Sequence, residues 1–219
     1  MSLSPRPLLQ VAIDVLSTRR ALEIVDLIYP YVDIVEIGTP LIIEEGLSAL
    51  EKIKSRFPDK KYLADLKIMD AGDIEATSAF KRGADIVTVL AAADDLTVRG
   101  ALDAAQRFGA QVMADLINVA DELGRAKELS SMHVPLMCLH TAYDLRDAGK
   151  DALVSLQTVR RAVSCRLAIA GGLTLKSIAD AVLKGADILV VGGGIINHAD
   201  PRGTAREIME KLTGSIGAS

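Results

Sequence analysis

Eight short apolar runs, each followed by a helix-like segment, constrain the fold of this chain more than any other feature. We expect the runs to be strands, because each is short enough for a buried parallel strand. They cover residues 8–14, 32–38, 62–67, 85–91, 111–117, 135–140, 166–172 and 187–193. The segments between them include 17–30, 73–83, 95–109 and 174–185, with Ser, Thr or Asp near the start and often Gly at the end. The order is therefore strand then helix, eight times.

The length of this repeating unit favours a closed barrel. Eight units in 219 residues leave about 27 residues per unit, near the minimum for a strand, a crossover helix and two short loops. The segments 82–89 and 184–191 also read alike, each as a helix end that leads into a strand. We predict an α/β fold with one (β/α)8 TIM barrel as a single domain over 1–219, with a short lead at 1–7 and a frayed tail at 213–219.

Composition and charge exclude several classes of partner. The formal net charge is −4 without a basic run, so a nucleic-acid backbone has little to attract it. No apolar stretch approaches the roughly 18 residues of a membrane span, and the start lacks an apolar signal region. We expect a cytoplasmic protein without nucleic-acid or membrane partners. Cys138 and Cys165 lack metal-site spacing and are interpreted as packing thiols.

Charged and polar side chains collect where the predicted strands end, which is where (β/α)8 barrels have their active sites. These residues are Asp14, Glu36, Asp65, Lys67, Asp70, Asp115 and His140. Residues two apart on a strand point to the same side, so Asp65 and Lys67 should project together into the barrel mouth. Alone, the pair could be a structural ion pair. Several carboxylates in one mouth would repel, so a cation is expected among them.

The residue types favour Mg²⁺ as that cation. Oxygen ligands without clustered Cys or His suit Mg²⁺ better than zinc. We expect Glu36 and Asp65 to be the ligands, although either could instead be a solvated or ion-paired carboxylate. His140 is the histidine placed for proton transfer, because His133 and His198 fall in loops. A core histidine with its hydrogen bonds satisfied is the alternative for His140.

Paired glycines end the last two predicted strands. They are Gly171 with Gly172 and Gly192 with Gly193. Barrels of this kind commonly bind phosphate there through backbone N–H groups, which glycine lets the oxygens approach closely. One such pair would usually be a turn, but two pairs at neighbouring strand ends favour a small phosphate-bearing ligand.

Several longer motifs then match a known family. VDIVEIGTPLI, LADLKIMDAG, GADIVTVLAAADD, LHTAYDLRDAGK, AIAGG and ADILVVGGGI occur in this order. Together they resemble the 3-hexulose-6-phosphate synthases of the orotidine-monophosphate decarboxylase suprafamily. The suprafamily signature Asp-x-Lys-x-x-Asp matches Asp65, Lys67 and Asp70. The resemblance runs from about Leu9 to the last predicted helix.

The resemblance implies an aldehyde-lyase. The expected reaction is the Mg²⁺-dependent, reversible aldol addition of formaldehyde to D-ribulose 5-phosphate through an enediolate, giving D-arabino-3-hexulose 6-phosphate. It fixes formaldehyde in the ribulose monophosphate pathway of one-carbon metabolism. The resemblance implies that Glu36 and Asp65 bind the metal, Asp14 contacts a substrate hydroxyl and Lys67 lies beside the enediolate. Asp70 would reach the neighbouring subunit's site in a homodimer with shared active sites.

The identity of the catalytic base is a separate hypothesis. Removing a proton from C1 of the ketose requires a base near the strand ends. We propose His140 for this role, with Asp115 as the second candidate.

Three alternatives remain in view. The sister enzyme 3-keto-L-gulonate-6-phosphate decarboxylase uses the same metal and lysine, but typically has Glu, Arg, Thr and Arg where this chain has Asp115, Tyr143, Ala170 and Gly193. Each difference favours the synthase. Ribulose-phosphate 3-epimerases build their metal site with histidines, which these strand ends lack. A non-catalytic sugar-phosphate sensor could share the fold, but would not need Lys67 and Asp70.

Overall fold

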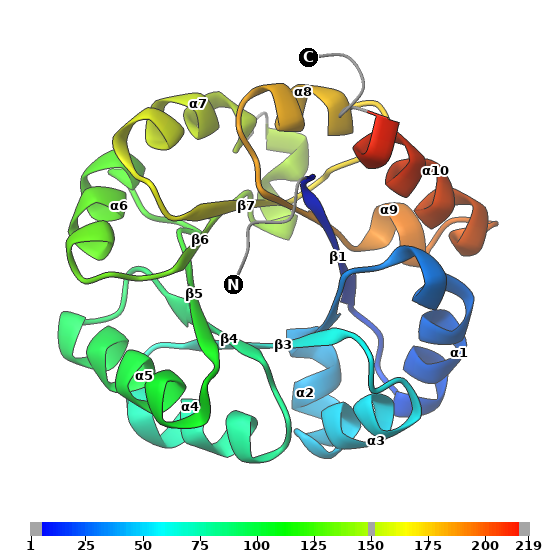
Figure 1. Cartoon of the computed structure of the whole chain (residues 1–219), viewed down its shortest axis with the longest axis horizontal. Helices are drawn as coiled ribbons and strands as arrows, with labels where there is room; N and C mark the ends of the chain where they lie inside the picture. Colours follow the sequence, from blue (N-terminus) through cyan, green and yellow to red (C-terminus); the bar gives the residue numbers. More distant parts are fainter. Residues whose placement is uncertain (1–5, 149–151, 215–219) are drawn as a thin grey trace.

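Eight parallel strands form one closed barrel surrounded by helices (Figure 1). The structure is a computed structural model that describes residues 6–148 and 152–214. The strands are β1 Leu8–Ile13, β2 Ile34–Ile37, β3 Lys61–Ile68, β4 Ile86–Leu90, β5 Gln111–Asp115, β6 Leu136–His140, β7 Arg166–Ala170 and β8 Ile188–Val191. Neighbours in sequence are neighbours in the barrel, and β1 pairs with β8 to close the ring. The predicted single-domain (β/α)8 barrel is confirmed.

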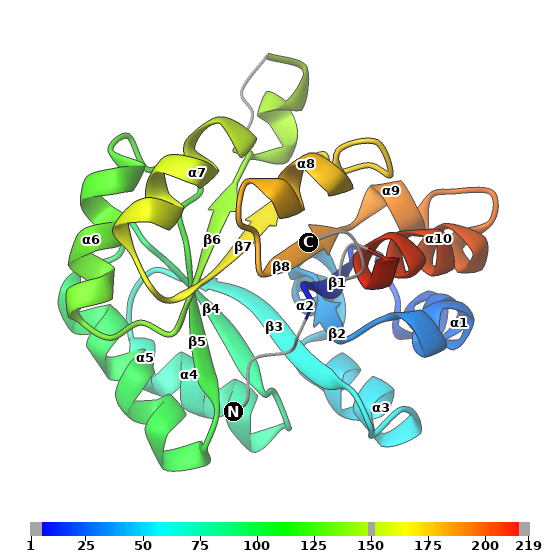
Figure 2. The ribbon, with the colours of Figure 1, turned by 45° about the horizontal axis from the view of Figure 1, so that its top comes forward.

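The helices cover the outside of the barrel, as the tilted view shows (Figure 2). They are α1 Thr18–Ile28, α2 Thr39–Glu45, α3 Ser48–Arg56, α4 Gly72–Lys81, α5 Asp95–Phe108, α6 Glu122–Ser131, α7 Leu153–Ala162, α8 Ile178–Leu183, α9 Gly193–Ile196 and α10 Pro201–Gly214, with short 3-10 helices η1 Tyr29–Tyr31 and η2 Tyr143–Ala148. No helix in these parts of the chain is long and apolar enough to cross a membrane.

Local sequence explains where several helices begin and end. Asp94 caps α5 by accepting a hydrogen bond from the N–H of Leu96 at 2.8 Å, and α5 ends at Gly109 with a left-handed φ of 63°. Several boundaries differ from prediction. Strands β5, β7 and β8 each end two residues before the predicted end, at Asp115, Ala170 and Val191. Helix α8 begins at Ile178 rather than near 174, because the Thr174 N–H donates to Ser177 Oγ and closes a turn first. Helix α10 continues to Gly214, so the frayed tail does not include 213–214, and 215–219 lie outside the described residues.

The alternation of side chains along the strands separates two apolar layers. One fills the space between strands and helices and contains most of the core. The other lies inside the barrel and is built from Leu8, Ala12, Ile34, Leu63, Ile86, Met113, Leu136, Cys138, Ala168, Ala170, Ile188 and Val190. Above this inner layer the inward positions become polar, so the packed barrel supports a polar site at the C-terminal ends of its strands.

The internal repeat has a structural basis at the opposite end of the barrel. Asp85, just before β4, accepts hydrogen bonds from the N–H of Tyr62 at 2.9 Å and from Lys54 Nζ at 2.9 Å. Asp187, just before β8, accepts from a backbone N–H of β7 at 2.8 Å and from Arg160 at 2.9 Å. Each aspartate therefore ties its own strand to the preceding one. The same contact therefore occurs in both halves of the barrel. It serves stability, because the active sites of such barrels lie at the opposite face, at the C-terminal ends of the strands.

Candidate active site

A cavity of about 690 Å³ opens at the C-terminal ends of the strands, and all eight strands contribute to its lining. It contains most of the residues expected from the sequence, namely Asp14, Glu36, Asp65, Lys67, Asp115, His140, Gly171, Gly172, Gly192 and Gly193. The prediction that strand-end side chains meet in one site is therefore confirmed for this set.

Asp65 is held in a fixed orientation by three side chains. Thr88 Oγ1 donates a hydrogen bond to one carboxylate oxygen at 2.7 Å. Thr39 Oγ1 donates to the other at 2.8 Å, and Lys67 Nζ forms an ion pair with that same oxygen. The Asp65 side chain is only 10% exposed, so these contacts replace most of its water.

Lys67 reaches Asp65 through a break in the regular strand. Ala64 pairs with Val87 and Ile68 pairs with Val89, so β3 carries two more residues than β4 over this stretch. Lys67 has φ 50°, in the left-handed region, which costs a residue with a side chain about 1–3 kcal/mol. The expectation that Asp65 and Lys67 point to the same side is confirmed, but the bulge rather than a regular strand produces the arrangement.

Thr88 connects the bulge to the carboxylate. Its Oγ1 accepts a hydrogen bond from the Lys67 N–H at 2.9 Å while donating to Asp65. One hydroxyl on β4 therefore holds both the backbone of the lysine and the side chain of the aspartate.

The charges in the cavity are unevenly compensated. Burial raises the pKa of Glu36 to about 8, and the nearby charge of Asp65 adds to the rise. Burial would also raise the pKa of Asp65, but the charge and hydrogen bond of Lys67 outweigh it and lower that pKa. Burial works against the charge of Lys67 too, yet Asp65 raises the lysine pKa overall. Asp65 and Lys67 thus neutralise each other, and an ionised Glu36 would need a further cation.

Gln10 is the neighbour of Glu36 inside the barrel. Its Nε2 donates to Glu36 Oε2 at 2.6 Å. Its Oε1 is buried and has no hydrogen-bond partner among the described residues. The Glu36 carboxyl group and an amide oxygen that lacks a donor therefore lie side by side.

His140 and Asp115 form a second interacting pair in the cavity. His140 Nδ1 lies 2.8 Å from Asp115 Oδ2, and the Ile117 N–H donates to Asp115 Oδ1 at 3.0 Å. In the tautomer with the proton on Nδ1, the imidazole donates a hydrogen bond to the Asp115 carboxylate. Its Nε2 is then unprotonated and can accept a proton. Burial and then the charge of Asp115 raise the pKa of the nearby Cys138 thiol. Cys138 packs with the apolar side chains inside the barrel, which confirms its predicted packing role.

Glycine backbones make room for Asp14 and for the last two strand ends. A Cβ at Gly38 would overlap the Asp14 carboxylate, and a Cβ at Gly192 would lie 3.2 Å from its other oxygen. Gly171 has φ 96°, and a Cβ there would overlap the carbonyl oxygen of Thr141. These positions require glycine for the cavity to keep its shape.

Asp70 is the predicted site residue that the cavity does not contain. It is exposed, two residues beyond the end of β3. The chain there turns outward through Ala71, whose φ is 49°, and enters α4 at Gly72, which packs on the backbone of Thr97. The residue-based expectation that Asp70 shares the barrel mouth is wrong for a single protomer.

Several polar residues that line the cavity were not predicted, and Gln10, Thr39 and Thr88 are three that bind its carboxylates. Gln10 and Thr88 interrupt apolar strands at inward positions, and Thr39 follows Gly38 at the start of α2. Gln10 and Thr88 could have been identified from the sequence, since a buried amide or hydroxyl within an apolar strand needs a hydrogen-bond partner.

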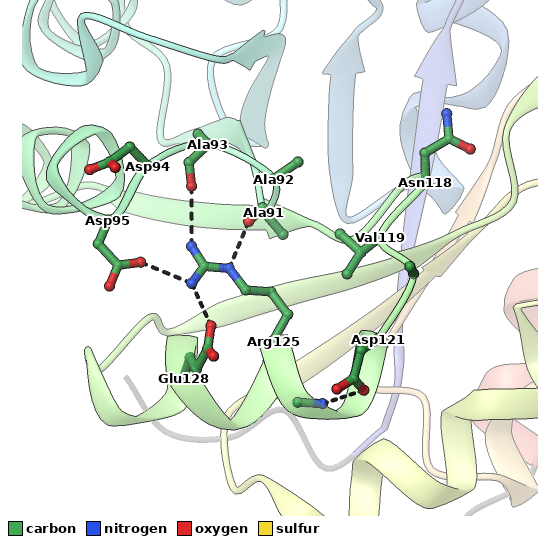
Figure 3. A pocket seen from close by; sticks show the side chains of 12 residues that line it. Ala91, Ala92, Ala93, Asp94, Asp95, Asn118, Val119, Asp121, Arg125 and Glu128 are labelled. Carbon is green, nitrogen blue, oxygen red and sulfur yellow. Dashed lines mark hydrogen bonds and ion pairs between the residues drawn. The ribbon is translucent and has the colours of Figure 1, made fainter.

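A second cavity of about 640 Å³ lies beside the β4–α5 turn and the loop before α6 (Figure 3). Arg125 on α6 forms part of its wall and is fully engaged there. It donates to the carbonyl oxygens of Ala91 at 2.7 Å and Ala93 at 3.2 Å, and pairs with Asp95 and Glu128 at 2.9 and 2.7 Å. This arginine therefore holds the β4–α5 turn and does not present a free charge to a ligand.

Comparisons with known proteins agree with this geometry. The model of the orotidine 5'-phosphate decarboxylase / HUMPS family matches residues 7–208. Over 205 residues, the chain is 43% identical to 3-hexulose-6-phosphate synthase of Bacillus subtilis (strain 168). The matched residues cover 93% of this chain and 98% of that protein.

Comparison with solved structures indicates the same family. The crystal structure of 3-hexulose-6-phosphate synthase from Salmonella typhimurium is similar with a TM-score of 0.92 at 38% identity, covering 94% of this chain and 99% of that one. The structure of KGPDC from Streptococcus mutans in complex with D-R5P has a TM-score of 0.89 at 25% identity, covering 95% and 98%. Because the family model spans most of the chain and the Bacillus relative nearly all of it, this chain belongs to the orotidine 5'-phosphate decarboxylase / HUMPS family.

Proposed function

We propose that this chain is a 3-hexulose-6-phosphate synthase. It catalyses the reversible, Mg²⁺-dependent aldol addition of formaldehyde to D-ribulose 5-phosphate and forms D-arabino-3-hexulose 6-phosphate. The observation that carries the proposal is one cavity with an ion pair, Lys67 with Asp65, and a hydrogen-bonded pair, His140 with Asp115. The names of the relatives at about 40% identity support the same reaction. Since phosphorylated sugars do not cross membranes unaided, we expect the protein to work in the cytoplasm.

Glu36 and Asp65 would hold the Mg²⁺. Within the described residues, no group of three His, Cys, Asp or Glu side chains could hold a metal ion by itself. Mg²⁺ commonly binds through one or two carboxylates and takes its other oxygens from water and substrate, so this donor set fits it. The uncompensated Glu36 and the unpartnered Gln10 Oε1 are consistent with a cation beside them. When bound, the ion supplies a positive charge that polarises the oxygens of the ketose.

His140 and Lys67 would perform the steps that move a proton and stabilise charge. With Nδ1–H donated to Asp115, His140 Nε2 takes a proton from C1 of the ketose, and the electron pair left behind delocalises as an enediolate. Lys67 stabilises the negative charge on the enediolate oxygens. C1 then forms a bond to the formaldehyde carbon as the C–O π bond breaks, and the formaldehyde oxygen takes the proton held by His140 to become the new hydroxyl.

The remaining residues would bind and distinguish the substrate. Asp14 accepts a hydrogen bond from a substrate hydroxyl, and the backbone around Gly171, Gly172, Gly192 and Gly193 binds the phosphate. The four positions that distinguish the synthase from the sister decarboxylase, Asp115, Tyr143, Ala170 and Gly193, all line the cavity. They therefore lie where a difference in side chain would change the chemistry.

We also propose a homodimer with shared active sites. Large apolar side chains are exposed in the first turns of α4 and α5, where Ile74 is 74% and Leu96 is 79% exposed. Gly72 packs on the backbone of Thr97, so the starts of α4 and α5 adjoin. Such a patch is typical of an interface. A second copy seated on it would meet Asp70, which precedes α4, and Asp70 would then reach the partner's cavity.

The first experiment measures the consumption of formaldehyde. Purified protein is incubated with D-ribulose 5-phosphate, formaldehyde and Mg²⁺, with and without chelator. We expect formaldehyde to be consumed only when Mg²⁺ is available. Lys67→Ala should abolish the consumption, whereas Lys61→Ala, a matched change at the exposed base of the barrel, should leave it intact.

Other outcomes would assign a different function. If formaldehyde is untouched and 3-keto-L-gulonate 6-phosphate releases carbon dioxide, the chain is the decarboxylase. If neither substrate reacts but D-ribulose 5-phosphate binds, the protein is a sugar-phosphate sensor.

A further inference from the structure

Gln10 is an unusual residue for the interior of this barrel. It lies on β1 in register with Ile34 of β2 and Val190 of β8, and it is 2% exposed. Its Nε2 is satisfied by Glu36, but no donor among the described residues reaches its Oε1. An unpartnered buried oxygen destabilises the folded state. An apolar residue at this position would avoid that cost, so the amide oxygen is better explained by a ligand that brings a donor.

The groups around Gln10 restrict what that donor can be. Among the described residues, Lys67 is the lysine or arginine that lines the same cavity, and its ammonium is paired with Asp65. Glu36 faces the other end of the amide, because its Oε2 accepts from Gln10 Nε2 at 2.6 Å. The donor must therefore arrive from the cavity. Water is small enough to enter, and a water bound to a cation is a stronger donor than a free one.

We propose that Gln10 is a positioning residue of the cation site. Its Nε2 fixes the carboxylate of Glu36, and its Oε1 accepts a hydrogen bond from a water molecule that the Mg²⁺ carries. This inference rests on the proposed function for the presence of Mg²⁺. Gln10 would contact the ligands of the metal ion rather than the ion itself, and residues in such positions typically change metal affinity by about 10–100-fold.

The test measures metal binding without turnover. Mg²⁺ is titrated calorimetrically into the full-length, metal-free protein and into Gln10→Met, which keeps the approximate volume but removes both hydrogen-bonding atoms. We expect Mg²⁺ to bind Gln10→Met about 10–100-fold more weakly, while the unfolding temperature in chelator stays the same or rises. The control Met113→Leu changes another buried residue of the same cavity and should bind Mg²⁺ as wild type does.

Two further measurements make the test specific. Gln10→Glu retains an acceptor for the water, so it should bind Mg²⁺ more tightly than Gln10→Met does. If Gln10→Met does not fold, Gln10→Glu replaces it as the variant that is compared with the wild type. The number of water molecules on bound Mn²⁺, measured by magnetic relaxation of the solvent, should be equal in wild type and Gln10→Met.

Each other result overturns the inference in a recognisable way. Equal Mg²⁺ affinity in wild type and Gln10→Met removes the role of Gln10 but leaves the proposed function standing. One additional water on Mn²⁺ in Gln10→Met would make Oε1 a direct ligand rather than an acceptor for water. Failure of the wild type itself to bind Mg²⁺ would remove both this inference and the proposed cofactor.

Discussion

Thr88 shows how much of the site depends on one hydroxyl. It accepts from the Lys67 N–H and donates to Asp65 Oδ1. Without it, a backbone in an unfavourable conformation and a buried carboxylate would each lose a partner. The geometry of the Asp65–Lys67 pair therefore depends on a residue of the next strand.

Replacing Thr88 by Val should disturb this arrangement without changing its volume. We expect the free energy of unfolding to fall by about 1–3 kcal/mol, because two buried polar groups lose their partner. The same change should reduce turnover. Urea denaturation and initial rates measure both effects. Thr88→Ser retains the hydroxyl and is the control; if Val and Ser behave alike, the hydroxyl does not matter.

Glu36 makes the stability of the metal-free protein depend on pH. Its pKa rises from 4.5 to about 8 on folding, so its contribution favours the folded state below about pH 4.5 and is lost as the pH rises to about 8. We expect wild type in chelator to lose stability over this window relative to Glu36→Gln, which stays neutral. Denaturant titrations from pH 5 to 9 measure the difference. A constant difference between the two proteins would contradict the assignment.

At the scale of elements, aspartates at the base of the barrel join consecutive strands. Asp187 and Asp85 accept a backbone N–H from the preceding strand together with a basic side chain. Asp33 does the same before β2, with the Leu9 N–H and Arg6. The contact recurs at β2, β4 and β8, so it is a property of the strand pair rather than of one site.

Asp187→Ala should therefore affect stability and spare catalysis. The pair with Arg160 is partly exposed, so its charge contributes little, and most of the effect comes from the unpaired Leu167 N–H. We expect a loss of about 1–2 kcal/mol in the free energy of unfolding with unchanged kcat. Asp180→Ala removes an exposed helical pair with Lys184 and should change stability by less than about 0.5 kcal/mol. A drop in kcat for Asp187→Ala would contradict this separation.

The same elements explain what could be predicted from sequence. Apolar runs and caps predicted the order of strands and helices, because these signals are local. The strand ends also predicted which side chains meet, since all parallel strands of a barrel end at one face. The bulge in β3 and the outward turn at Asp70 were not predictable, because they depend on contacts with other elements, such as Thr88 and Thr97.

At the scale of the whole molecule, the exposed position of Asp70 makes the proposed homodimer testable by mixing. Lys67→Ala and Asp70→Ala subunits should each be inactive. If Asp70 acts in the partner's site, a mixed dimer has one intact site. Random reassociation of equal amounts should then recover about a quarter of wild-type activity, measured by formaldehyde consumption. Recovery of none would mean that Asp70 acts within its own protomer or outside the site.

Closure of the barrel also has a consequence for how the protein is made. The first strand finds its second neighbour only when β8, at Ile188–Val191, has left the ribosome. Until then, the nascent chain carries an open sheet with two unpaired edges and an apolar inner face, which are the features that promote association between chains. Synthesis through β8 must therefore precede closure of the native barrel.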